Sequence, residues 1–208
     1  MKRPSEVSPT DDSDEQQQLT STSSPPASAT SLSSDLADLL NASRLSDVTL
    51  ITKDKQELKA HKAILGARSP VFASMFETDM IEQNQNIVRI EDFEHEVLLE
   101  ALKYIYAGTT ERLDELAGEI LPVAEKYDIR PLKVDCEKLL EERIDLDSCA
   151  KILVLADTCN AEGLKAAAES FIIERGGEIM KANEELQLLR SSHPHLLGDI
   201  LFKLLESK

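Results

Sequence analysis

The chain has 208 residues, which suggests one folded domain with an appended subdomain. Lys and Arg number 23 against 39 Asp and Glu, so the formal net charge is -16. This charge repels phosphate backbones and anionic membrane surfaces, so binding to nucleic acid or to a membrane is disfavoured. Because no apolar run approaches the ~20 residues of a membrane span and the start lacks the apolar core of a signal peptide, we expect a protein of the nucleus, the cytoplasm or both.

Residues 1–33 form a Ser/Thr/Pro-rich acidic tail. The segment offers almost no side chains to bury, so folding could not offset the conformational entropy that ordering would cost. We therefore expect this tail to be disordered.

The folded part is predicted to begin at Ser34, a residue type that caps helices. Leucines at helical spacing mark the first helix: Leu32, Leu36, Leu39 and Leu40. Two strands at 47–52 and 56–60, joined by a polar turn, predict a hairpin.

Two short helices are expected next, followed by a third strand. The helices cover 61–68 and 70–77, where Ser69 can cap the second helix and Pro70 takes its first position. The strand is predicted at 86–92.

From Glu94 onward the apolar spacing is helical throughout, and Pro122 is expected to kink or break its helix. The last helix has an apolar stripe that is wide for a chain end, which indicates contact with a partner chain. This element order is not an alternating βαβ pattern, so we predict an α+β fold in which a small sheet is covered by a helical cluster and followed by a helical extension.

The sequence gives little sign of catalysis. It contains four His but no nucleophile elbow, phosphate-binding loop, dinucleotide fingerprint or zinc-protease motif. Asp47 and His61 are predicted to form a buried structural pair at the strand ends rather than a catalytic one. The His193 and His195 pair lacks neighbouring ligands for a metal, and without Trp a base-stacking platform is not expected. We predict a protein-recognition module with no enzymatic activity, cofactor or metal.

The three cysteines also favour the nucleus or the cytoplasm, which are reducing compartments. They are Cys136, Cys149 and Cys159, an odd number without a C-x-x-C pair. This usage is typical of unpaired thiols in a reducing compartment and not of a disulfide framework.

Several motifs, in order, resemble a BTB/POZ domain. They begin with SRLSDVTLITKDKQELKAHKAILGARSPVFASMFETDMIE and continue with YIYAG and LPVAEKYDIRPLKVDCEKLL. The similarity is closest to the speckle-type POZ protein group of MATH-BTB adaptors, whose following helical region resembles CAKILVLADTCNAEGLKAAAESFI and SHPHL. The resemblance implies a BTB/POZ fold over 34–143 and a helical three-box or short BACK-like region over 144–208.

The resemblance also implies a function and partners. Proteins of this group are dimeric adaptors that recruit cullin-3 RING ubiquitin ligases, leading to ubiquitination and proteasomal degradation of a bound protein. Their dimer surface corresponds here to Leu32, Leu36, Leu39 and Ile64. The partner chain is then a second copy or a MATH-BTB relative, although the same leucines could pack only within one subunit.

The cullin-binding motif of the group corresponds to Met80, Ile81 and Glu82, and Tyr104 and Tyr127 are expected to line the same face. Ordinary core packing is the alternative for Tyr127. The end of the chain can self-associate in this group, and Leu201 matches an apolar position there. The rival interpretation is that this helix folds back onto 184–190.

The chain differs from the group in one respect, since only the tail precedes the BTB-like part where a substrate-binding MATH domain of ~130 residues is expected. The substrate is therefore unknown. The chain could heterodimerise with a MATH-BTB relative, use its tail as a linear motif through LTSTS at 19–23, or compete for cullin-3 without delivering a substrate. A BTB scaffold that modulates such relatives or transcriptional regulators without cullin-3 is the alternative function.

Overall fold

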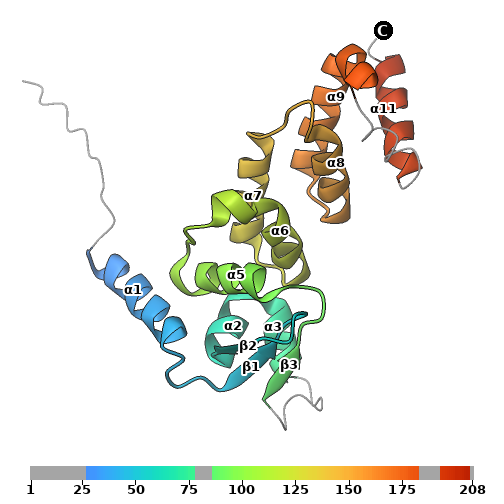
Figure 1. The fold of residues 1–208 in the computed structure, drawn as a ribbon. Helices are drawn as coiled ribbons and strands as arrows, with labels where there is room; N and C mark the ends of the chain where they lie inside the picture. The colour runs from blue at the N-terminus through green and yellow to red at the C-terminus, as the bar shows by residue number, and fades with distance from the viewer. Residues whose placement is uncertain (1–26, 78–85, 183–192, 207–208) are drawn as a thin grey trace, which may run out of the picture.

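The computed structural model describes residues 27–77, 86–182 and 193–206 (Figure 1). The fold class is α+β, with a small three-stranded sheet covered by helices and followed by a helical extension, as predicted. The LTSTS motif and the cullin-motif residues Met80, Ile81 and Glu82 lie outside the described residues. Within the described ranges, no helix has both the length and the hydropathy that a membrane span requires.

The sheet consists of β1 (Val48–Ile51), β2 (Glu57–Ala60) and β3 (Ile87–Arg89), in the order β2-β1-β3. Strand β1 pairs antiparallel with β2 and parallel with β3. Leu50 on β1 lies between Leu58 and Val88, and all three are buried. The sheet therefore presents one apolar face to the helices, and the alternation of apolar and polar residues fixes its register.

The helices form packed pairs along the chain (Figure 1). Helix α2 packs on α3, α6 on α7 and α8 on α9, and α9 also packs against α7 and α11. Their bounds are α1 (Ala27–Asn41), α2 (Lys62–Arg68), α3 (Pro70–Glu77), α5 (His95–Ala107), α6 (Leu113–Lys126), α7 (Arg130–Glu141), α8 (Cys149–Thr158), α9 (Glu162–Ala182) and α11 (Pro194–Glu206).

Helix α1 begins earlier than predicted. It starts at Ala27, so residues 27–33 are helical although they were expected to belong to the disordered tail, and Ser34 lies inside the helix. Helix α1 packs along α5, and the Ser33 hydroxyl donates a 2.6 Å hydrogen bond to the carbonyl of Ala107 at the end of α5. This tertiary contact supports a helical turn that local composition alone did not predict.

Helix α6 continues through Pro122, so of the predicted kink or break, the break is wrong. Proline cannot donate a backbone hydrogen bond to the residue four positions earlier, Gly118. The neighbouring residues Ile120, Leu121 and Val123 are all fully buried. Their packing keeps the helix intact, which shows tertiary burial outweighing the local cost of proline.

Buried apolar residues form one cluster that extends from the sheet to the last helix. Among the residues whose burial is described, five polar or charged ones are buried with them: Thr52, His61, Ser69, Glu100 and Glu169. Because a buried polar group must be hydrogen-bonded to be tolerated, the partners of these residues show which segments are held together.

Candidate functional site

The segment AHKAILGARSPVFASMF contains a Ser and a His that could be taken for a reactive pair. Ser69 is fully buried; its hydroxyl donates a 2.5 Å hydrogen bond to the carbonyl of Tyr127 and accepts one of 3.1 Å from the N–H of Phe72. The second bond caps α3 as predicted. Since both bonds are structural, Ser69 fixes α3 against the end of α6 and is not placed as a nucleophile.

His61 and Asp47 do not pair with each other, so this prediction was wrong in its partners. The His61 ring lies 2.8 Å from the hydroxyl of Tyr106 through Nδ1 and 2.6 Å from the carbonyl of Arg44 through Nε2. Asp47 is exposed and accepts a 2.8 Å hydrogen bond from the N–H of Lys62, the first residue of α2. Sequence spacing thus identified Asp47 and His61 as structural residues at the strand ends. It did not identify the groups that they contact at 2.6–2.8 Å.

The predicted dimer residues lie on helices that share one neighbour, because α1 and α2 both pack on α5. Leu32 is 61% exposed, Leu36 and Leu39 are half-buried, and Leu40 is buried in the core. Ile64 on α2 is half-buried as well. Helix α1 thus uses one edge of its leucine stripe within the subunit and leaves the other edge accessible.

Tyr104 and Tyr127 are core residues rather than open surface. Tyr127 is 1% exposed and stacks on Phe72, with ring centroids 4.3 Å apart and planes 4° from parallel, so it follows the core-packing alternative. Tyr104 is 5% exposed, and its hydroxyl donates a 2.6 Å hydrogen bond to Asp135 on α7. Burial raises the pKa of both phenols, most directly because the ionised form would lose its hydration.

The C-terminal helix carries an apolar face that the rest of the described chain does not cover. Leu196 and Ile200 are buried against the core, whereas Leu201, Phe202 and Leu205 are 60%, 62% and 75% exposed. Leu201 was predicted as a self-association residue, but Phe202 was missed. The two positions are adjacent on the face away from the buried pair, which a helical projection of the last stripe could have shown.

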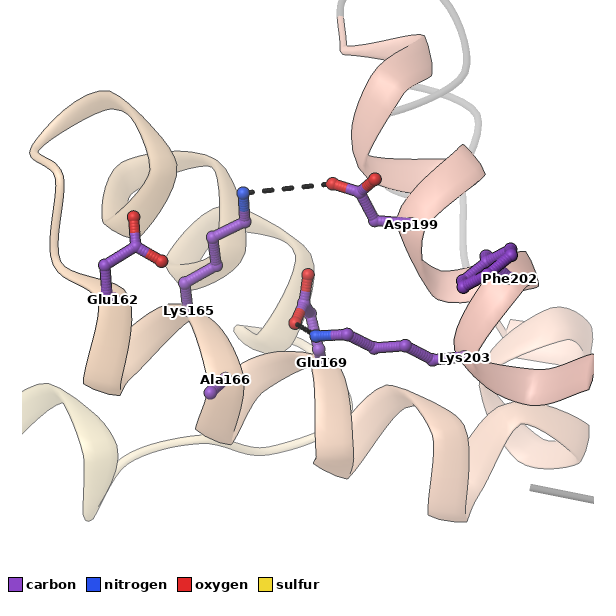
Figure 2. A pocket seen from close by; sticks show the side chains of 7 residues that line it. All are labelled: Glu162, Lys165, Ala166, Glu169, Asp199, Phe202 and Lys203. Carbon is purple, nitrogen blue, oxygen red and sulfur yellow. Dashed lines mark hydrogen bonds and ion pairs between the residues drawn. The ribbon is translucent and has the colours of Figure 1, made fainter. Parts of the chain in front are cut away.

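Charged residues attach α11 to α8 and α9. Helices α9 and α11 line a cleft of about 220 Å³. In Figure 2 the two helices face each other, and Phe202 lies on the α11 side. The buried carboxylate of Glu169 forms an ion pair with Lys203. On the same side, the ammonium group of Lys165 lies 2.7 Å from Asp157 on α8 and 3.9 Å from Asp199.

His195 takes part in this ion network. Its Nε2 lies 3.0 Å from the second carboxylate oxygen of Asp157. Lys165 first, and then His195, lower the pKa of Asp157 by stabilising the carboxylate. Within residues 27–77, 86–182 and 193–206, no group of three His, Cys, Asp or Glu is arranged to hold a metal ion.

The thiols are placed for packing. Cys136, Cys149 and Cys159 are all buried. Burial raises the pKa of Cys136 to about 12 and that of Cys159 to about 11. Because the thiolate is the reactive form, these two groups are poor nucleophiles at neutral pH.

The described residues therefore form a structural core with two surfaces suited to protein contacts, the partly exposed leucine stripe of α1 and the apolar face of α11. A family model, the BTB/POZ domain, matches residues 36–144, which is more than half of the chain. The matched segment includes the end of α1, the sheet, and the helices from α2 to α7. The chain belongs to the BTB/POZ domain family and is built as a protein-interaction scaffold.

Proposed function

We propose that this protein is a dimeric adaptor that recruits a cullin-3 ubiquitin ligase and so directs a bound protein to ubiquitination and proteasomal degradation. The observation that carries the proposal is the order of parts: a BTB/POZ domain at 36–144 is followed at Cys149 by the packed helices α8 and α9. This order matches the resemblance to MATH-BTB adaptors that the sequence motifs indicate.

The dimer contact is proposed to use the accessible edge of the α1 stripe together with α2. Leu32 exposes most of its side chain, and Leu36 and Ile64 are half-buried within one subunit. A stable two-fold interface buries about 1,600 Å² in total, which would remove these side chains from water. The partner is a second copy, or a MATH-BTB relative that supplies substrate recognition.

The cullin contact is proposed to use Met80, Ile81 and Glu82, between α3 and β3. A flexible Met side chain suits an apolar pocket, and Glu82 would pair with a basic or hydrogen-bonding group of the ligase. Tyr104 and Tyr127, which were expected to line this face, are buried: Tyr104 joins α5 to α7, and the carbonyl of Tyr127 holds α3 through Ser69.

A titration of the full chain against the N-terminal domain of cullin-3 tests the proposal. We expect saturable binding that Met80→Lys or Glu82→Lys weakens at least tenfold, because each places a positive charge in the contact. Lys55→Glu, an exposed change in the β1–β2 turn, is the matched control and should bind as the wild type does. If a well-folded wild-type protein does not bind, the cullin proposal is wrong and a scaffold without cullin-3 remains.

The dimer is tested separately by light scattering. Leu32→Glu combined with Leu36→Glu should convert a dimer to a monomer, because two carboxylates would be buried in the contact. Leu45→Glu is the control, since Leu45 is 85% exposed but lies in the loop after α1. A wild-type protein that is monomeric at high concentration would contradict the dimer.

A further inference from the structure

The outer edge of β2 has no partner strand among the described residues. Strand β2 is at the end of the described sheet, with β1 on its other side. Thr52 donates a hydrogen bond to the carbonyl of Gln56, which sets the phase of the antiparallel ladder and makes Leu50 and Leu58 a hydrogen-bonded pair. Consequently the backbone groups of Glu57 and Lys59 point away from β1.

The unpaired edge is short. Beyond one end, the N–H of Lys55 is bonded to the carbonyl of Thr52, and beyond the other the N–H of His61 is bonded to the hydroxyl of Tyr106. Between them, the outward N–H and C=O groups of Glu57 and Lys59 meet no acceptor or donor among the described residues. The edge therefore offers two donors and two acceptors over three residues.

A cleft of about 430 Å³ lies beside this edge. It is lined by β2, by the end of α1 and by Leu99 of α5; the full lining is Leu40, Asn41, Ser43, Glu57, Leu58, Lys59 and Leu99. Leucines from three elements thus give the cleft an apolar part on the side that Leu58 faces. The volume suits one short extended segment rather than the folded body of a second copy.

The side chains along the edge specify a complementary sequence. Glu57 and Lys59 are exposed on one face of β2, and Leu58 between them faces inward. An antiparallel strand would place an acidic residue opposite Lys59, an apolar residue opposite Leu58 and a basic residue opposite Glu57. The two charged residues of that strand would each form a hydrogen-bonded pair, one with Lys59 and one with Glu57. These pairs would satisfy the outward N–H and C=O groups of both residues.

We propose that the edge of β2 binds an extended segment of a protein partner by antiparallel strand addition, with an acidic–apolar–basic order from its N-terminus. Main-chain hydrogen bonds would hold the segment, as in other cases of strand addition. The alternating charges would fix the direction in which the segment lies along β2. This inference goes beyond the proposed function, because it needs neither cullin-3 nor the residues of the predicted cullin contact.

The test uses the full chain and two fluorescein-labelled peptides. The first is Gly-Ser-Thr-Glu-Val-Lys-Thr-Ser-Gly, and the second has its Glu and Lys exchanged. By fluorescence polarisation, the wild type should bind the first peptide about tenfold more tightly than the second, because two attractive cross-strand pairs become two repulsive ones.

A double variant makes the test independent of folding defects. Glu57→Lys combined with Lys59→Glu changes two exposed residues and should reverse the preference, so that the second peptide binds more tightly. Lack of saturable binding by either peptide, equal affinity for both, or a preference that the double variant leaves unchanged would overturn the proposal. A particle mass without peptide that differs between the wild type and the double variant would also overturn it, because that difference would indicate that two β2 edges pair with each other.

Amide hydrogen exchange locates the bound peptide. The first peptide should slow exchange at the N–H groups of Glu57 and Lys59, which have no acceptor among the described residues. The N–H of Leu58 is the internal control, since it is already paired with β1. Protection that appears only at other positions would overturn the assignment to this edge.

Discussion

Ser69 and His61 in the BTB/POZ part and Glu169 and Asp157 in the C-terminal helices are held in different ways. In the BTB/POZ part, Ser69 and His61 are bonded to backbone carbonyls and a phenol, and these contacts lie among fully buried rings such as Tyr127. In the C-terminal part, Glu169 and Asp157 rely on ammonium and imidazole groups that remain partly in water. The buried Glu100 of the BTB/POZ part also pairs with a partly exposed ammonium group, that of Lys103. The contrast is therefore between the hydrogen bonds of Ser69 and His61 and the ion pairs that attach α11.

This difference indicates separate stabilities. Ion pairs near water are screened by salt and contribute little each, whereas neutral hydrogen bonds in a packed core are screened far less. Among the side chains of α11 that the structure describes, Leu196 and Ile200 are buried against the core. We therefore expect α11 to detach in a local opening before the BTB/POZ part unfolds.

The largest expected effect is on the aromatic stack of the BTB/POZ part. Phe72→Ala should lower the free energy of unfolding by about 3–5 kcal/mol, because the 1% exposed ring leaves a cavity beside Tyr127. Urea denaturation followed by circular dichroism measures the change. Leu45→Ala is the control for side-chain truncation at an exposed site. A loss below 1 kcal/mol for Phe72→Ala would mean that the stack does not organise this region.

The next effect concerns the hydroxyl that joins α3 to the end of α6. Ser69→Ala should lower the free energy of unfolding by about 1–3 kcal/mol, since the carbonyl of Tyr127 and the N–H of Phe72 both lose their partner in a buried site. Ser34→Ala, an exposed change on α1, should have little effect in the same urea titration. Equal effects of the two substitutions would contradict the structural role given to Ser69.

A smaller and local effect is expected at the C-terminal helix. Lys203→Met should weaken the attachment of α11 by about 1–2 kcal/mol, because the buried carboxylate of Glu169 loses its ion-pair partner. Hydrogen exchange should become faster in α11 and stay unchanged in β1. Lys55→Met, in the exposed β1–β2 turn, provides the comparison. Faster exchange in both regions would show that they do not open separately.

The smallest expected effect is a dependence on acid. The pKa of Asp157 is lowered in the folded chain, so the carboxylate adds stability above its unfolded pKa of about 3.9 and loses that contribution as the pH falls through the folded value. The urea midpoint of α11 detachment should therefore fall between pH 5 and pH 3. Asp157→Asn should remove this part of the pH dependence, and an identical slope in both proteins would contradict it.

Much of the fold followed from periodicity, and the misses share one physical cause. Alternating residues placed the three strands within a few residues of their observed ends, and Ser69 with Pro70 located the start of α3. The start of α1 and the continuity of α6 through Pro122 depend on tertiary packing, which no local pattern encodes.

The site residues show the same limit. Sequence spacing selected Asp47 and His61, but each has another partner: Asp47 accepts from the N–H of Lys62, and His61 contacts the carbonyl of Arg44 and the distant Tyr106. The exposure of Phe202 and the free edge of β2 depend on which faces the fold covers, and this follows only from the assembled structure.

The mass of the complex with the N-terminal domain of cullin-3 tests the central claim most directly. By light scattering, the chain alone should have twice its 23.1 kDa mass, and at saturation each dimer should carry two cullin domains. Two chains with two cullin domains is the result that the dimeric adaptor predicts. A monomer, or a folded dimer whose mass does not change when the cullin domain is added, would contradict it.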